Sequence, residues 1–282
     1  MLTKAKAVAS LFTDTMDANE VKDPDPVLMG LAAAGLKQLG KYFRIKVEGL
    51  ENMPEGKALI VGNHNAGITF LEPMFLAAAW FEKTGGKDDL FFLVHDAMVA
   101  IPVVGNLLMK LGNIRASHET ATNAFSMGRK VVVFPGGNYE AFRPFKDRYK
   151  VDFGGKKGFV RLALKNQVPI VPILSIGGHE TFFVLHRGAK LAELLGVKKY
   201  LRSESFPIFL GLPWGIGIGP IFHLPLPSKC MVEVGEPISL EGYTPEDAND
   251  PVKLSELYNR VQGTLQKMMD KRAAKRKFPV LG

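Results

Sequence analysis

Short apolar runs and helical repeats alternate along most of the chain. Six runs have the length and the β-branched or aromatic content of strands: residues 44–48, 58–61, 90–94, 131–134, 168–173 and 231–234. Apolar residues recur at helical spacing in residues 25–43, 72–82, 103–111, 119–127, 158–165 and 253–277. Strands that alternate with helices predict a single-domain α/β fold, with a mostly parallel twisted sheet flanked by helices.

We expect three parts along the chain. Residues 1–44 form a helical N-terminal segment that is a candidate for membrane association. Residues 45–240 hold the α/β core, and residues 241–282 contain an amphipathic helix followed by a basic tail. The apolar face of that last helix is expected to comprise Leu254, Leu257, Val261, Leu265 and Met268.

One long stretch, residues 205–228, contains no Asp, Glu, Lys or Arg. Its prolines and glycines interrupt any continuous helix, which argues against a bilayer-spanning segment. Two alternatives remain, a buried irregular segment and an apolar patch at a membrane interface. We favour the buried segment.

Composition and charge narrow the function classes. Hydrophobic residues make up 46% of the chain and charged residues 23%, which is typical of a folded globular protein. Cys230 is the single cysteine, so an internal disulfide framework and a cysteine zinc cluster are excluded. The N-terminus lacks the pattern of a secretory signal, which favours a cytoplasmic location.

The net charge of +8 is concentrated at the end of the chain. Residues 267–282 hold six basic residues and one acid, a net charge of +5. The remainder is only mildly basic, which argues against nucleic acid as a partner. A basic tail beside an amphipathic helix instead favours peripheral attachment to an anionic membrane, on its cytoplasmic face.

Polar residues follow the second predicted strand, where an α/β sheet binds its ligands. His64 is suited to act as a general base because its ordinary pKa lies near 6.5. Glu72, placed at the cap of the following helix by Pro73, is the nearest carboxylate that could hold the imidazole. Two residues at this spacing also fit a purely structural pair. His179 and Glu180 form a rival pair.

Two other places carry candidate binding groups. Gly136 and Gly137 follow a strand and suit either an anion-binding turn or an ordinary tight turn. Arg115 ends a short extended segment and suits either a phosphate or carboxylate clamp or a surface ion pair.

Four sequence motifs that follow one another along the chain favour the functional interpretations over the structural ones. They are Gly-Asn-His at 62–64, Gly-x-Ile-Arg-Ala-Ser at 112–117, Val-Val-Val-Phe-Pro-Gly-Gly at 131–137 and Val-Pro-Ile-Val-Pro-Ile at 168–173. Together with Val-Gly-Glu-Pro-Ile at 234–238, they resemble the glycerolipid acyltransferase family over about residues 45–240. The resemblance implies transfer of a fatty acyl group from an acyl thioester, acyl-CoA or acyl carrier protein, to a lipid hydroxyl.

The resemblance also implies roles for individual residues. His64 becomes the general base with Glu72 as its partner, and the substrate site comprises Asn63, Arg115, Phe134, Pro135, Gly136, Gly137 and Glu140. No metal or other cofactor is expected, since the acyl thioester is a co-substrate. The expected partners are this donor, a lipid acceptor and a membrane surface.

Two departures from the family pattern bear on the acceptor. Thr69 stands where the family has an aspartate, which leaves Glu72 as the carboxylate. Gly136 stands in place of the usual motif glutamate, and Asn138-Tyr139 in place of Thr-Arg, with Glu140 slightly later. Both changes resemble the branch of diacylglycerol and monoacylglycerol acyltransferases, and without the motif arginine a neutral acceptor competes with a phosphorylated one. A non-catalytic lipid-binding protein and a thioesterase-like hydrolase remain the alternatives.

Overall fold

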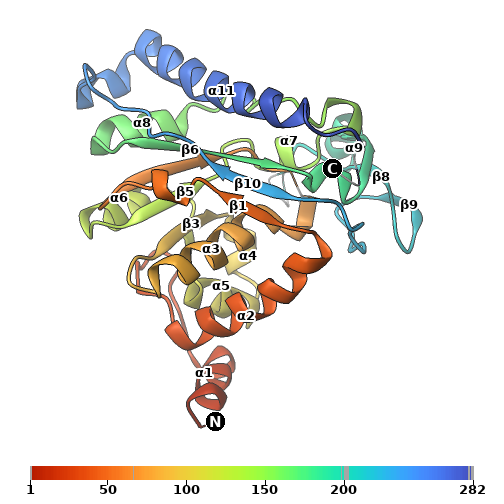
Figure 1. Cartoon of the computed structure of the whole chain (residues 1–282), viewed down its shortest axis with the longest axis horizontal. Coiled ribbons are helices and arrows are strands. Elements are labelled where there is room, and N and C mark those ends of the chain that lie inside the picture. Colours follow the sequence, from red (N-terminus) through yellow and green to blue (C-terminus); the bar gives the residue numbers. More distant parts are fainter. Residues whose placement is uncertain (1, 66, 198, 200–202, 279, 281–282) are drawn as a thin grey trace.

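A seven-stranded sheet forms the centre of the molecule (Figure 1). The computed structural model describes residues 2–65, 67–197, 199, 203–278 and 280. In spatial order the strands are β1 (Lys46–Glu48), β10 (Met231–Val234), β6 (Ile170–Ile176), β2 (Ala58–Gly62), β5 (Lys130–Val133), β3 (Leu90–Val94) and β4 (Asn113–Arg115). All neighbouring pairs are parallel except β10 with β6. The predicted α/β fold with a mostly parallel sheet is confirmed.

Helices cover both faces of this sheet (Figure 1). The α-helices of the described residues are α1 (Leu2–Thr13), α2 (Pro26–Tyr42), α3 (Leu71–Thr84), α4 (Asp96–Val99), α5 (Val104–Lys110), α6 (His118–Ser126), α7 (Asn138–Ala141), α8 (Gly158–Asn166), α9 (Ala189–Leu194) and α11 (Pro251–Ala273). Short 3-10 turns lie at Leu50–Asn52, Gly67–Thr69, Phe145–Asp147, Gly178–Glu180 and Pro245–Asn249.

The central strand β2 is apolar throughout because both of its faces are covered. Leu59 and Val61 pack into the cluster formed with α6, α8 and α11, whereas Ala58 and Ile60 pack against α3 on the other face. Successive side chains of a strand point to opposite faces, so a sheet covered on both sides requires apolar residues at every position.

The start of α2 follows the capping rules. The Asp25 side chain accepts hydrogen bonds from the Val27 and Leu28 amides at 2.9 and 3.1 Å, and Pro26 opens α2. The predicted start of α3 is wrong by one residue. The helix begins at Leu71, so Glu72 lies in its first turn rather than at its cap.

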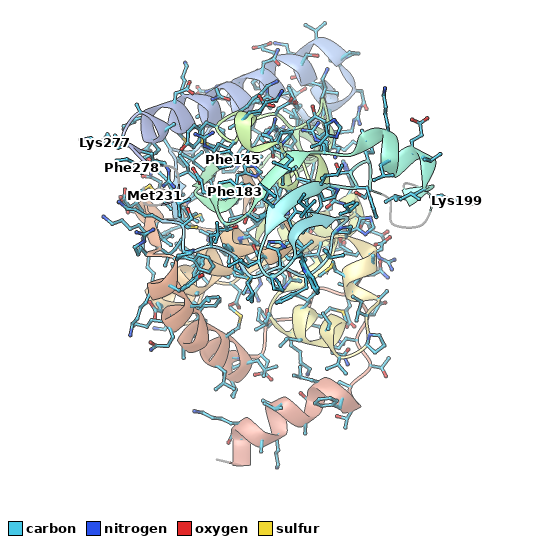
Figure 2. All side chains as sticks on the ribbon, turned by 90° about the vertical axis from the view of Figure 1, so that its right-hand side faces the viewer. Phe145, Phe183, Lys199, Met231, Lys277 and Phe278 are labelled. Atoms are coloured by element: carbon cyan, nitrogen blue, oxygen red, sulfur yellow. The ribbon has the colours of Figure 1, made fainter. Side chains whose placement is uncertain are left out.

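A second, smaller sheet is antiparallel and comprises β7 (Phe183–His186), β8 (Ile208–Gly211) and β9 (Gly215–Ile218). It lies at one end of the molecule and faces the viewer in Figure 2. The prediction of a buried irregular segment over residues 205–228 is therefore wrong. Much of the stretch folds as the β8–β9 hairpin, and many of its large apolar side chains are exposed.

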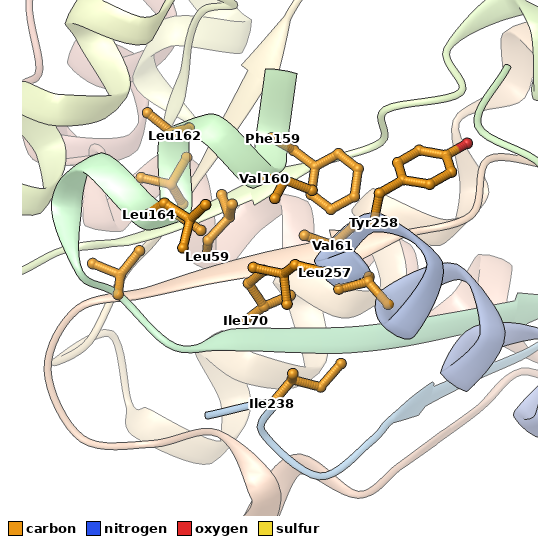
Figure 3. Close-up of a cluster of buried hydrophobic side chains, with 14 of the residues drawn as sticks. Leu59, Val61, Phe159, Val160, Leu162, Leu164, Ile170, Ile238, Leu257 and Tyr258 are labelled. Carbon is orange, nitrogen blue, oxygen red and sulfur yellow. The ribbon is translucent and has the colours of Figure 1, made fainter. Parts of the chain in front are cut away.

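The C-terminal helix α11 belongs to the core. Leu254, Leu257, Val261 and Leu265 are buried in the same cluster as the strand residues of β2. Figure 3 shows Leu257 of this helix beside Leu59 and Val61 of the strand. The apolar face predicted for this helix is thus largely used for packing within the protein, which leaves its polar face to solvent.

Part of the basic tail is neutralised within the fold. Arg272 pairs with Glu233 at 2.6 Å and with Glu48 at 2.8 Å, and Arg276 pairs with the buried Glu180 at 3.4 Å. The lysines at 267, 271, 275 and 277 remain exposed. The tail therefore offers fewer free charges to a membrane than its sequence indicates.

Candidate active site

The candidate site begins where β2 ends. A Cβ atom on Gly62 would lie 2.7 Å from the Phe134 ring and 2.8 Å from the Ile173 side chain, so only glycine lets these neighbours close over the strand end. The next residues, Asn63 and His64, leave the sheet at its carboxyl edge, where α/β folds place their ligands.

Two asparagines on either side of His64 fasten the chain to β6. The side-chain amide of Asn63 donates through Nδ2 to the Ser175 carbonyl at 2.8 Å, and its Oδ1 accepts from the Ser175 backbone amide at 2.8 Å. Asn65 donates to the same carbonyl at 2.7 Å. Asn63, expected to bind substrate, has a side chain engaged by the protein backbone and holds His64 in place.

His64 and Glu72 come together as the sequence predicts. The Nδ1 atom of His64 forms a hydrogen bond with Glu72 Oε1, and the Asn65 amide donates to the same oxygen at 2.9 Å. The chain between them folds back through left-handed residues at Gly67 and Phe70, with φ of 57° and 47°. A positive φ is costly for phenylalanine, and such strain often accompanies functional sites.

Burial and mutual attraction oppose each other in this pair. Burial alone would lower the pKa of His64, but the charge and hydrogen bond of Glu72 hold that pKa above its ordinary value of 6.5. Burial alone would raise the pKa of Glu72, but His64 and the Asn65 amide hold it below 4.5. The pair therefore favours an ionised carboxylate beside a histidine of increased basicity.

Two aromatic rings line the histidine. Phe70 stacks on His64 with ring centroids 5.7 Å apart, and Phe134 lies 5.4 Å away in a tilted arrangement. Phe134 is the expected site residue that directly follows β5. Apolar walls reduce water around a reacting group and strengthen the electrostatic interactions inside.

The side chain of Glu140 contacts the backbone of His64. Its carboxylate accepts the His64 amide at 3.2 Å and the Asp152 amide at 3.1 Å, and Arg143 lies 3.6 Å away. Burial raises the pKa of Glu140 to about 7, although these amides and the arginine oppose the shift. This carboxylate, expected to bind substrate, is instead engaged by two amides of the protein.

Glu140 also explains the departure at Gly136. A Cβ atom on Gly136 would lie 2.3 Å from Glu140 Oε2. The carboxylate thus occupies the space into which a side chain at position 136 would project.

The turn of Pro135, Gly136 and Gly137 is held by hydrogen bonds to other residues of the protein. The Gly137 amide donates to the Phe134 carbonyl at 3.0 Å, and Lys156 Nζ donates to the Gly136 carbonyl at 3.1 Å. The turn therefore joins β5 to α7 and places Glu140, whereas its expected role in substrate binding stays a prediction.

Arg115 lies on a different part of the sheet edge. It ends the edge strand β4, and β3 and β5 separate that strand from β2. Its side chain pairs with Asp96 at 3.0 Å and donates to Asn19 at 3.0 Å. The structure does not bring Arg115 to His64, and its role as a substrate clamp remains a prediction.

Two buried residues near the histidine carried no role in the resemblance. Arg143 pairs with Glu140, a contact that their three-residue spacing within one helical turn could have indicated. His179 is buried, and burial lowers its pKa to about 3, with help from the charges of Arg143 and His64. The rival pair is not formed, since Glu180 instead bonds Tyr149 and contacts Arg148 and Arg276.

Within the described part of the chain, no group of three or more His, Cys, Asp or Glu side chains could hold a metal ion. Among the same residues, no helix is both long enough and apolar enough to cross a bilayer.

Comparisons with known proteins bear on the family of the chain. Residues 44–176 match the model of the Acyltransferase family. An uncharacterized protein of Mycobacterium tuberculosis is 34% identical over 81% of this chain and 61% of its own length. A mouse protein named "DGAT1/2-independent enzyme synthesizing storage lipids" is 27% identical over 80% of this chain and 60% of its own length. The chain thus spans about three fifths of the length of these relatives.

The fold also matches a solved structure. The crystal structure of the 1-acyl-sn-glycerophosphate acyltransferase PlsC from Thermotoga maritima superposes with a TM-score of 0.51 and 16% sequence identity. The match covers 89% of this chain and 81% of that one. Residues 44–176 thus match the acyltransferase family model, and the fold of the chain resembles that of PlsC.

Proposed function

We propose that the protein transfers a fatty acyl group from an acyl thioester, acyl-CoA or acyl carrier protein, to the hydroxyl of a glycerolipid or another lipid alcohol. The observation that carries this proposal is the buried His64–Glu72 pair at the carboxyl end of the central strand. A histidine whose Nδ1 proton is held by a carboxylate has its Nε2 lone pair available as a base.

The reaction then follows from the pair. His64 Nε2 takes the proton of the acceptor hydroxyl as its oxygen attacks the thioester carbonyl, and Glu72 stabilises the imidazolium that forms. The tetrahedral intermediate collapses with cleavage of the carbon–sulfur bond. The imidazolium returns its proton to the departing thiolate, so the products are an ester and a free thiol, and the histidine is neutral again.

Two observations support a neutral acceptor. Arg143 is buried, and its guanidinium is engaged by Glu140 at 3.6 Å and by the Asp152 carbonyl at 3.1 Å. An arginine held in this way is not free to grip a phosphate. The mouse relative, in turn, is named for the synthesis of storage lipids.

The test measures thiol release from long-chain acyl-CoA and acyl carrier protein. Diacylglycerol, monoacylglycerol, a long-chain alcohol and lysophosphatidate serve as acceptors, and mass spectrometry identifies the product. We expect acceptor-dependent ester formation that falls by about 10²- to 10⁴-fold in His64→Ala, the usual contribution of a positioned general base. His118→Ala, which removes an exposed histidine on α6, is the matched control.

Other outcomes would assign another function. Free fatty acid as the sole product would indicate a thioesterase, and lipid binding without thiol release would indicate a carrier. Undiminished transfer by His64→Ala would contradict the mechanism.

A further inference from the structure

The outer face of the small sheet is apolar and exposed. Its side chains pair across the β8–β9 hairpin, Ile208 with Ile218 and Leu210 with Ile216. Ile216 is 64% exposed, Ile218 53% and Leu210 40%. Three neighbouring large apolar residues that are exposed on one hairpin form more than the scattered exposure common on protein surfaces.

The inner face of the same hairpin is packed on the candidate active site. Phe209 points inward, where a Cβ atom on Gly217 would lie 2.3 Å from its ring, so the glycine makes room for it. Phe209 contacts Phe182, and Phe182 in turn approaches Gly67 so closely that a Cβ atom there would lie 2.4 Å away. The hairpin thus packs, through Phe182, against the loop that joins His64 to Glu72.

Two aromatic side chains are exposed at this end of the hairpin. Trp214, at the tip, is 55% exposed, and Phe222, in the segment after β9, is 68% exposed. The indole Nε1–H of Trp214 donates to the Phe222 carbonyl at 2.5 Å. This bond joins the hairpin tip to the segment that follows β9. We define the apolar face as Leu210, Leu212, Trp214, Ile216, Ile218 and Phe222.

Lysines lie on either side of the small sheet on the same side of the molecule. Figure 2 shows the small sheet toward the viewer, with Lys277 and Phe278 to one side and Lys199 to the other. The segment 205–228 itself contains no Asp, Glu, Lys or Arg. An apolar surface with tryptophan at its tip, with lysines farther to either side, matches the interfacial region of a bilayer with anionic lipids.

We propose that the apolar face inserts into the surface of a lipid bilayer and places the His64 loop beside the lipids. The choice of a bilayer as occupant rests on the proposed function, since both the acyl group and its acceptor would be dissolved in that phase. The geometry supplies the connection, because one side of the hairpin packs through Phe182 on the loop between His64 and Glu72 and the other side is exposed. The hairpin, rather than the packed face of α11, then provides the apolar part of membrane attachment.

The test uses Trp214 as a reporter. The chain has two tryptophans, and Trp80 is only 6% exposed in the core. We expect vesicles of phosphatidylcholine and phosphatidylglycerol that carry brominated acyl chains to quench the emission of the full-length protein. Trp214→Phe should abolish that quenching while the protein still floats with vesicles, because phenylalanine keeps the apolar surface.

Charged substitutions test whether the apolar face is the surface that binds vesicles. The double variant Ile216→Glu with Ile218→Glu should weaken vesicle partitioning by about tenfold or more, since two apolar side chains no longer enter the bilayer. Val252→Glu is the matched control, because Val252 is also apolar and 72% exposed but lies on α11. It should leave partitioning unchanged.

Several results would overturn the proposal. They are the absence of quenching by brominated lipids, equal partitioning of the double variant, and a concentration-dependent dimer that the double variant abolishes. Failure of the proposed function is separable, because it would appear as quenching and partitioning without acyl transfer.

Discussion

The two sheets of this protein use apolar residues in opposite ways. Strand β2 of the large sheet buries every residue from Ala58 to Gly62 between two layers of helices. The hairpin of the small sheet buries Phe209 and Gly217 on one side and exposes Ile216 and Ile218 on the other.

The difference lies in what covers each face. Fully burying an aliphatic side chain contributes about 1.5–3 kcal/mol to stability, so the large sheet supplies much of the folding free energy. The exposed side of the small sheet supplies little, which fits the proposed contact with a bilayer. The large sheet holds the His64–Glu72 pair, and the small sheet packs between the loop of that pair and the surface.

The largest effect is expected from a single change at the edge of the large sheet. Glu72→Gln keeps the size of the side chain but removes the charge that stabilises the imidazolium of His64. We expect the rate of acyl transfer to fall by about 10²- to 10⁴-fold. Because Glu72 raises the pKa of His64, the acidic limb of the pH–rate profile should also move to lower pH.

Steady-state kinetics over a range of pH measures both effects. Glu82→Gln, on an exposed part of the same helix, should leave rate and profile unchanged. A loss of rate with an unmoved acidic limb would mean that Glu72 supports the fold without acting on His64.

A pair of truncations compares the two sheets directly. Leu59→Ala removes a fully buried side chain from β2 and should lower the free energy of unfolding by about 2–5 kcal/mol. Ile216→Ala removes a side chain that is 64% exposed on β9 and should change it by no more than about 0.5 kcal/mol. Urea denaturation of the two variants measures both values. Equal losses would mean that the outer face of the small sheet is covered within the protein in solution.

Much of the large sheet was predictable because its signals are local. Runs such as residues 58–61 and 231–234 are apolar at every position, and Asp25 with Pro26 marks a helix start. The small sheet was not predictable in this way. Its glycine-rich hairpin resembles a loop in composition, and whether Ile216 and Ile218 are buried depends on what else lies near them in space.

In the candidate site, too, contacts between residues close in the sequence could be predicted and contacts that depend on the fold could not. The pairing of His64 with Glu72 could be predicted, since a short loop connects them and no nearer carboxylate follows. The positions of Glu140 and Arg115 could not. Glu140 reaches the His64 amide from another strand's turn, and Arg115 lies on an edge strand whose distance from β2 depends on strand order.

The last prediction concerns Glu140, between the two sheets. Its carboxylate holds the His64 amide, and Phe142, two residues later, packs with Phe182 and Phe209 of the small-sheet cluster. The folded protein keeps the Glu140 proton up to about pH 7, whereas the ordinary pKa is 4.5, so the folded state binds more protons between these values. Its stability should therefore fall as pH rises from about 4.5 to about 7.

Glu140→Gln carries no ionisable carboxyl and should lack this contribution. Relative to the parent, the variant should gain up to about 3 kcal/mol in free energy of unfolding between acidic and alkaline pH, most of it below neutrality. Urea denaturation at a series of pH values measures the difference, with the exposed Glu241→Gln as control. If the stability curves of parent and Glu140→Gln run parallel, Glu140 ionises at the same pH in the folded and unfolded states, and the amides and Arg143 offset its burial. If the parent instead loses stability relative to the variant as pH rises from about 4.5 to about 7, the backbone of His64 is held by a carboxyl group that titrates near neutral pH.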